Sequence, residues 1–415
     1  MKYIIKRIKI HLLLAVSAMV FLISCNKDLE QLAGPAVITP TGLALGDAIA
    51  AIPNDSLYYK LILRAGPATL GLLNNKPTIF TLFVPDNNAM RNFMNLISGG
   101  ATVGYTDPQY VAFINSAISA STAASIVSYN MIPQSITTAS VPNTFPNWFY
   151  PTNLNPTGTP GTPGYNALVR LLTFPSTRNG NWVNNVPLTS VNAVAFNGTI
   201  HTASLMVPVP PSRFLWQRIA NDPDMTYLAA AITRADSGVA PTTSASLIWV
   251  LSNFGPNLTV FAPTNVAFQN LIFGLVYQQV FAATGNAALA TAIANGAVAA
   301  GPAFLSTNNV STQTVKGIVV YQMMGSRAFT NNFPATATSY PTLLNGGIPT
   351  HPGIALTATF TGPLVSAATV KGVGNGTAAN IIINAIPFLP DPFGTSDQHF
   401  VNGTLHKITQ VLLPQ

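Results

Sequence analysis

The stretch NGTIHTASLMVP at residues 197–208 returns near the end of the chain as NGTLHKITQVLLP at residues 402–414. An Asn-Gly pair is a strong signal for a tight turn, and the alternation of apolar and polar residues after it is typical of a β-strand. The same turn and strand occurring twice predicts an internal repeat, so the fold is best interpreted as two copies of one unit.

Two further pairs of segments keep the same order along the chain. FTLFVPDNNAM at 80–90 matches LTVFAPTNVAF at 258–268, and in both a β-rich run ends at proline before a polar residue in the N-cap position of a helix. IVSYNMI at 126–132 matches IVVYQMM at 318–324, and both predict apolar, half-buried segments. The separation between copies grows from 178 to 192 to 205 residues. We therefore expect two homologous domains in tandem, with insertions in the loops of the second.

These segments together resemble the fasciclin-like domain, whose signatures are a Thr-x-Phe-x-Pro box before a helix and a terminal Asn-Gly-x-[Ile/Leu]-His box. The resemblance covers residues 43–209 as a first domain and 214–415 as a second. It implies an α+β fold in which each domain is a β-wedge or sandwich with helices packed on one side. It also implies extracellular adhesion or matrix contact as the function.

The chain departs from the family at one position in each copy. Adhesive members carry a Tyr-His pair where this chain has Tyr129-Asn130 and Tyr321-Gln322. We expect both tyrosines to be buried on a strand. The replaced histidine argues against transferring integrin-type recognition to this chain.

Composition excludes several classes of function. Charged residues make up 7% of the 415 residues, and Glu30 is the one glutamate. Glutamate-dependent metalloprotease and glycosidase sites are therefore excluded from both domains. The net charge of +7 is concentrated at the N-terminus, and the remainder has no basic run, so we expect no nucleic-acid partner.

The first 42 residues are typical of an exported lipoprotein. A basic start and an apolar run from Ile10 to Ile23 predict a signal peptide over 1–24. The sequence Leu22-Ile23-Ser24-Cys25 resembles a bacterial lipobox, and Cys25 is the single cysteine, so we expect it to carry the lipid (palmitate) anchor. The alternative is that Cys25 merely ends an ordinary signal peptide.

Residues 25–42 predict a tether between the membrane and the first domain. The charged residues just after Cys25 resemble the surface-export signals of Bacteroidetes-type lipoproteins, and their alternative interpretation is a solvated linker. We expect an outer-membrane, lipid-anchored protein exposed at the cell surface.

The long Ala-rich stretch 271–304 is interrupted by Gln278, Gln279, Asn286 and Asn295. These polar residues favour helices of a soluble domain over a membrane span.

Two histidines recur between the copies. His201 and His406 each lie three residues after the turn glycine. A ligand or proton-shuttle role is conceivable, but without a recurrent carboxylate or thiol nearby we favour a strand histidine whose ring completes hydrogen bonds.

A second cluster, Asp391, Asp397 and His399, could bind a metal or act as acid and base. The neighbouring residues Pro390, Pro392 and Gly394 favour an exposed loop instead. We assign the cluster no equivalent in the first copy. The strand piece 380–385 is matched with residues 191–193 of the first copy. We find no catalytic constellation and predict no enzyme activity, cofactor or metal.

The most unusual stretch is an aromatic insertion at residues 141–190. Exposed aromatic rings among amide side chains are suited to stack on sugar rings or protein partners. The alternative is that these rings close a small core under the loop. The candidate ligand-binding residues are Trp148, Phe149, Tyr150, Tyr165 and Trp182.

The sequence therefore predicts an envelope lipoprotein that mediates adhesion or matrix and protein contact. The alternative function is a surface glycan-binding accessory protein of a polysaccharide uptake system, acting through the insertion 141–190. The expected partners are the membrane, through Cys25, and an extracellular protein or polysaccharide.

Overall fold

A computed structural model describes residues 42–415 apart from 159, 307–309, 363 and 387. The predicted signal peptide, Cys25 and the tether as far as residue 41 lie outside the described residues. We refer to residues 42–209 as the first half and residues 214–415 as the second half.

The first half combines helices with a six-stranded sheet of order β2-β1-β8-β7-β6-β5. Its parallel centre is formed by β1 and β8, and the remaining pairs are antiparallel. A separate two-stranded ribbon joins β3 and β4. The elements are α2 (Leu45–Ala50), η1 (Pro53–Asp55), α3 (Ser56–Ala65), α4 (Pro67–Asn74), β1 (Phe80–Pro85), α5 (Asn87–Ile97), α6 (Asp107–Ala117), α7 (Ala120–Tyr129), β2 (Met131–Ile132), η2 (Thr138–Ser140), β3 (Tyr150–Pro151), β4 (Leu172–Thr173), β5 (Pro175–Ser176), β6 (Trp182–Val183), β7 (Val186–Ala195) and β8 (Gly198–Ala203).

The second half builds the same parallel centre from β9 and β16, in a sheet of order β10-β9-β16-β15. A second, antiparallel sheet has the order β11-β12-β13-β14. The elements are α8 (Leu215–Asn221), α9 (Thr226–Ala235), α10 (Leu247–Ser252), β9 (Leu258–Pro263), α11 (Asn265–Thr284), α12 (Ala287–Ala299), η3 (Gly301–Ser306), α13 (Thr312–Tyr321), β10 (Met323–Met324), η4 (Thr330–Asn332), β11 (Thr338–Tyr340), η5 (Leu343–Gly346), β12 (Ile354–Thr361), β13 (Leu364–Lys371), β14 (Ala379–Asn380), β15 (Gln398–Phe400) and β16 (Gly403–Ile408).

The two parallel centres have the same register, which is the structural form of the sequence repeat. Six residues pair in each: Phe80↔Gly198 through Pro85↔Ala203, and Leu258↔Gly403 through Pro263↔Ile408. The predicted N-caps are confirmed, since Asp86 accepts from the Ala89 N–H at 2.7 Å and Thr264 from the Ala267 N–H at 3.2 Å.

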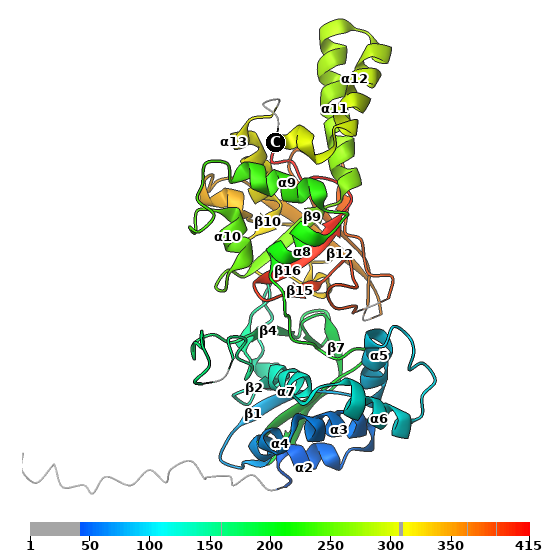
Figure 1. The fold of residues 1–415 in the computed structure, drawn as a ribbon, viewed down its shortest axis with the longest axis vertical. Helices are drawn as coiled ribbons and strands as arrows, with labels where there is room; N and C mark the ends of the chain where they lie inside the picture. Colours follow the sequence, from blue (N-terminus) through cyan, green and yellow to red (C-terminus); the bar gives the residue numbers. More distant parts are fainter. Residues whose placement is uncertain (1–41, 159, 307–309, 363, 387) are drawn as a thin grey trace, which may run out of the picture. The chain divides into compact units, whose positions relative to one another are not determined.

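In the second half, the β9–β16 sheet separates two cores. Leu258, Val260 and Ala262 of β9 join the core formed with the helices, whereas Phe261 faces the core shared with the second sheet. This alternation follows from the two-residue period of a strand. The predicted α+β class, with helices packed on one side of a sandwich, is confirmed (Figure 1).

The expectation that the two repeat tyrosines lie on strands is wrong. Tyr129 is the last residue of α7 and Tyr321 the last of α13, and each strand that follows has two residues. Ser119 and Ser311 cap these helices by accepting from backbone N–H groups at 3.0 and 3.1 Å. The apolar β-branched run before each tyrosine suggested a strand, but the serine cap and the burial of one face produce a helix.

Candidate functional site

Each half holds one buried histidine on the strand that follows the Asn-Gly turn. In the first half, Nε2 of His201 lies 2.9 Å from the Ile136 carbonyl oxygen, and Nδ1 accepts from the Asn192 N–H at 3.3 Å. Because Nδ1 accepts, the ring proton is on Nε2, which donates to Ile136. Burial lowers the pKa of His201, so the ring is neutral with both nitrogens occupied.

His406 repeats this arrangement in the second half. Its Nε2 lies 2.9 Å from the Ala328 carbonyl oxygen, and its Nδ1 accepts from the Asp397 N–H at 3.1 Å. Burial again lowers the pKa of the ring. The interpretation of both residues as hydrogen-bonded strand histidines is confirmed, and neither has a nitrogen available for a ligand.

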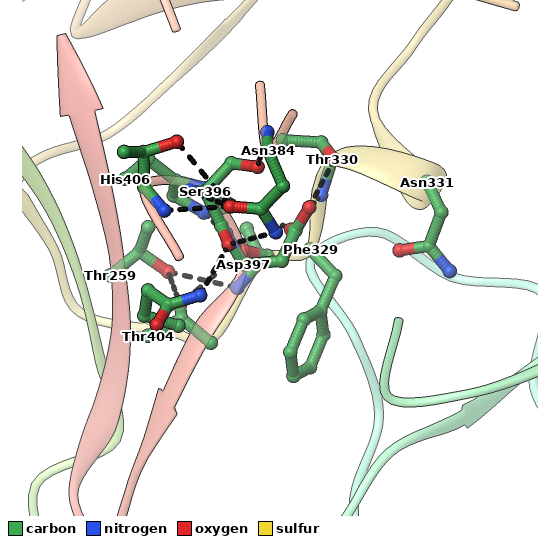
Figure 2. Close-up of polar contacts among 12 residues, drawn as sticks. Thr259, Phe329, Thr330, Asn331, Asn384, Ser396, Asp397, Thr404 and His406 are labelled. Carbon is green, nitrogen blue, oxygen red and sulfur yellow. Dashed lines mark hydrogen bonds and ion pairs between the residues drawn. The ribbon is translucent and has the colours of Figure 1, made fainter. Parts of the chain in front are cut away.

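The residue that holds each histidine also recurs. Asn192 and Asp397 both lie nine residues before their histidine and both have a left-handed backbone, with φ of 63° and 54°, which Asn and Asp tolerate best. Thr138 donates its N–H to Asn192 at 2.8 Å, and Thr330 donates its N–H to Asp397 at 2.7 Å. Figure 2 shows Asp397 among Thr330, Ser396 and His406.

Two sequence predictions are corrected by this equivalence. Asp397 does have a first-copy counterpart, Asn192, and residues 191–193 therefore do not correspond to 380–385. The spacing of nine residues before each repeat histidine was a sequence signal for this equivalence, but the match with 380–385 followed the apolar strand pattern of that segment instead.

The Asp397–His406 pair could be mistaken for the base of a catalytic triad. The carboxylate Oδ1 lies 3.8 Å from His406 Nδ1, but Nε2 faces a backbone carbonyl instead of a hydroxyl or thiol. Asp397 also accepts from the Thr330 hydroxyl at 2.5 Å. With no nucleophile to activate, the pair holds a loop against a strand.

Asp391, Asp397 and His399 line one small cavity of about 60 Å³, but their side chains bond to different partners. Asp391 pairs with Arg213, Asp397 with Thr330, and His399 turns toward the first half. Among the described residues, no group of three His, Cys, Asp or Glu side chains could hold a metal ion. The expectation of an exposed loop is also wrong, since Asp397 is buried and the other two are half-buried.

His399 lies at a contact between the two halves. Its Nδ1 is 3.2 Å from the Tyr129 hydroxyl, and its Nε2 accepts from the guanidinium of Arg327. Burial and the charge of Arg327 lower the pKa of His399 well below its ordinary value. The ring is therefore neutral, with its proton on Nδ1 because an arginine can only donate.

Arg327 is fully buried, and the described residues give it no carboxylate partner. It donates to Asn257 Oδ1 at 2.7 Å and to the Phe400 carbonyl at 3.0 Å, and its guanidinium carbon lies 4.6 Å from the centroid of the Phe174 ring. Burial lowers the pKa of Arg327 to about 9. Phe174 belongs to the aromatic insertion, so this cation joins the insertion to the second half.

Much of the aromatic insertion contacts the second half instead of solvent. Phe174 packs against Phe329 and Phe145 against Phe333, with ring centroids 5.7 Å apart in both pairs. Further polar contacts join the insertion to the second half: Asn147 N–H to Arg327 O at 3.0 Å, Ser176 Oγ to Asn332 Oδ1 at 2.8 Å, Asn179 Nδ2 to Asn331 O at 3.0 Å and Asn331 Nδ2 to Asn184 O at 3.2 Å. In Figure 2, Asn331 points away from the Asp397 cluster.

The five candidate ligand-binding residues divide into three groups by exposure. Trp182 is 1% exposed and donates its indole N–H to the Asn179 carbonyl at 3.2 Å, so its ring face is unavailable. Tyr150 and Tyr165 are half-buried. Trp148 and Phe149 are 51% and 43% exposed, and their rings stack at 5.8 Å with an interplanar angle of 15°. These two residues form the part of the set that a ligand can reach.

Sequence reasoning missed the exposure of the helical hairpin formed by α11 and α12. α11 is long and apolar enough to cross a membrane by length and composition, and 17% of its apolar window is buried within the fold. No charged residue occurs between Asp236 and Lys316. That absence was a usable sequence signal, because surface helices of soluble proteins normally carry charges.

Comparisons with known proteins find matches among solved structures. No family model matches the sequence, and no curated protein matches it. One solved structure that matches is a FAS1 domain pair from the insect cell adhesion molecule fasciclin I. The two chains are 12% identical, the match covers 86% of this chain and 95% of that chain, and the TM-score is 0.31.

Proposed function

We propose that this chain is a non-catalytic interaction protein of the cell envelope that mediates adhesion to an extracellular protein or matrix. The observation that carries the proposal is the exposed, stacked pair Trp148 and Phe149. Large, rigid aromatic side chains give much contact area for little loss of conformational entropy, and they dominate the energetics of protein interfaces.

The position of this pair is fixed in advance of binding. Asn147, directly before Trp148, donates its N–H to Arg327 and accepts from the Phe329 N–H at 3.2 Å. Phe149 lies 6.4 Å from the ring of Phe174, which is buried. A pre-organised platform loses less entropy on binding than a free loop does.

The low charge of the chain favours a neutral target. With 7% charged residues, little long-range field is available to attract an ionic partner. A neutral polysaccharide is the second candidate ligand, favoured by the nearly parallel, stacked rings of Trp148 and Phe149, since an exposed aromatic face can pack on the apolar face of a sugar ring.

The binding test compares Trp148→Ala and Phe149→Ala with Leu168→Ala, an exposed apolar residue of the same insertion. Immobilised wild-type and variant proteins are exposed to panels of matrix proteins and of neutral polysaccharides. Loss of protein binding in the two aromatic variants, with Leu168→Ala unchanged, supports adhesion. Loss of polysaccharide binding alone supports the glycan alternative, and unchanged binding of both panels refutes the platform.

We further propose that the protein is anchored in the outer membrane by lipid on Cys25. The sole cysteine follows the apolar run and lipobox-like residues described above. Cells are labelled with an alkyne analogue of palmitate, and wild type is compared with Cys25→Ser. Loss of label and release from the membrane fraction support the anchor, whereas label retained by the variant contradicts it.

A further inference from the structure

The second half carries a structure that the first half lacks. α11 has 20 residues where its counterpart α5 has 11, and with α12 it forms a hairpin that extends away from the sheet (Figure 1). The hairpin begins after the same Pro and N-cap signal as α5, and in chain order α12 and η3 stand where the first half has α6.

A groove runs along the hairpin between α11, α12, η3 and α13, with a cavity volume of about 1120 Å³. Its lining includes the buried residues Ile272 and Val319, half-buried Val280, and the exposed residues Leu275 and Ile293. Such a volume is at the upper end of pockets that hold organic ligands. The groove is therefore large enough for a long ligand instead of a single small group.

The groove offers an occupant almost no polar contacts. Thr284 donates its hydroxyl to Val280 O at 2.8 Å, and the Ser311 hydroxyl accepts from the Thr314 N–H at 3.1 Å. Gln279 also lines the groove and brings an amide side chain to it. Among the described residues that line the groove none is charged, and the sequence has no charged residue between Asp236 and Lys316.

This chemistry selects the occupant. A peptide strand or a sugar would leave its hydrogen-bonding groups unsatisfied against these walls, and an ionic group would have no countercharge. A hydrocarbon chain needs neither. We propose that the groove binds the hydrocarbon chain of one lipid molecule, with an uncharged part of that lipid near Gln279.

The other face of α11 provides a control for the groove. Phe273, Tyr277 and Phe281 stack on one another along that face, with ring centroids 5.9 and 5.8 Å apart. Phe281 is 43% exposed yet lies outside the groove lining, whereas Leu275 and Ile293 are 55% and 44% exposed and line it. Phe281 is therefore a matched control for apolar exposure on the same hairpin.

The test uses the full chain carrying Cys25→Ser, so that no lipid attached at that residue can compete. The neutral fluorophore N-phenyl-1-naphthylamine is titrated, and hexadecanol, an uncharged long-chain alcohol, is used to displace it. We expect one site per chain. The double change Leu275→Gln and Ile293→Gln should weaken hexadecanol binding about tenfold or more, because each glutamine replaces apolar surface that the hydrocarbon chain would cover. Phe281→Gln should leave the affinity within about twofold.

A second variant, Ala283→Trp, separates groove filling from general adsorption, since Ala283 lines the groove and is exposed. It adds apolar surface while blocking the cavity, so the proposal expects weaker binding of hexadecanol. Tighter binding by Ala283→Trp, or equal losses in the Leu275, Ile293 and Phe281 variants, would overturn it.

Two controls identify other occupants. Flotation with neutral phosphatidylcholine vesicles detects bilayer adsorption, and sedimentation detects pairing of two copies through the hairpin. Vesicle binding or dimerisation that depends equally on Leu275, Ile293 and Phe281, without saturable hexadecanol binding, refutes the single-lipid site. Circular dichroism of each variant confirms that the fold is retained.

Discussion

The two halves use the same backbone contacts around different side chains. Asn87 accepts from the Leu57 N–H at 2.9 Å, and its counterpart Asn265 accepts from the Tyr227 N–H at 3.2 Å. Between these equal contacts, the first half buries Asp55 where the second buries Met225. The difference teaches that backbone bonds made by a few amides define the repeat, while the buried side chains beside them can change from ionisable to apolar.

A second difference lies where helix and final strand meet. The Asn130 side chain donates to Pro208 O at 2.9 Å, and Gln322 donates to Leu412 O at 2.8 Å. Leu412 also donates its N–H to Gln322 at 3.1 Å, but Pro208 has no N–H, and Asn130 Oδ1 is buried without a protein partner. The second half is therefore the better satisfied of the two at this position.

The largest expected effect compares the two turn glycines. A Cβ on Gly198 would lie 1.9 Å from the Phe80 carbonyl oxygen, whereas one on Gly403 would lie 2.6 Å from that of Leu258. We expect Gly198→Ala to lower the free energy of unfolding by about 4 kcal/mol or more, and Gly403→Ala by about 2–3 kcal/mol. Both clashes are with backbone, which cannot move aside as a side chain can, and the closer clash at Gly198 should cost more. Differential scanning calorimetry measures both, and equal effects would contradict the stated asymmetry.

The next test exchanges Arg327 for serine, the residue that the first half carries at the equivalent position 135. Serine cannot reach the half-buried Asn257 or the carbonyl of the buried Phe400, so both acceptors lose this donor. We expect the free energy of unfolding to fall by about 3 kcal/mol, and the backbone amides of the insertion 141–190 to exchange hydrogen faster.

The matched control for Arg327→Ser is Ser135→Ala. Ser135 makes one hydroxyl contact with Thr199 at 2.9 Å, so its removal should cost about 1 kcal/mol or less. If Arg327→Ser is as mild as Ser135→Ala, the buried arginine does not hold the insertion in place.

A smaller, stabilising effect is expected from Asp55→Met, which places in the first half the residue type that the second half has at the equivalent position, Met225. Burial and, next, the charge of Asp86 raise the pKa of Asp55 to about 6. The folded state therefore disfavours the ionised carboxylate, and the penalty is present above pH 6 and disappears as the pH falls toward 4. We expect a gain of about 1–2 kcal/mol at pH 7 that shrinks between pH 6 and 4.

Urea unfolding across this pH range measures the effect, with Met225→Asp as the reciprocal variant. A gain that stays constant from pH 7 to pH 4 would show that packing, not ionisation, distinguishes Asp55 from Met225.

The smallest expected effect comes from Asp397→Asn, which copies Asn192. Asparagine can keep both contacts with Thr330, as Asn192 does with Thr138 at 2.8 and 2.7 Å. The change in unfolding free energy should be below about 1 kcal/mol. The charge of Asp397 raises the pKa of His406 against the larger effect of burial, so its removal should move the titration of His406 to lower pH.

That titration can be followed by NMR with labelled histidine. An upward shift, or no shift beside an unchanged His201, would show that the carboxylate does not act on the ring. A large loss of stability would show that the two clamps are not interchangeable.

The repeat could be predicted because its signals are local. An Asn-Gly turn, a proline at a strand end and a polar N-cap each act within a few residues, and each recurs in order. The equivalence of Asn192 and Asp397 was missed although both lie nine residues before a repeat histidine, because only the structure shows that each backbone N–H bonds to that histidine. The burial of Trp182 agrees with the alternative that the insertion rings close a small core, but the composition of residues 141–190 did not show which rings would be buried and which exposed.

By itself, the sequence determined that the chain repeats an α+β unit, that its two repeat histidines are hydrogen-bonded strand residues, and that charge is absent over a long stretch of the second half. These properties follow from local propensity and composition. Only the tertiary structure decided that the insertion packs on the other half through Arg327 and Phe174, and that α11 and α12 leave an open apolar groove. Contacts between segments far apart in the chain depend on which surfaces the fold brings together, and no local pattern encodes that choice.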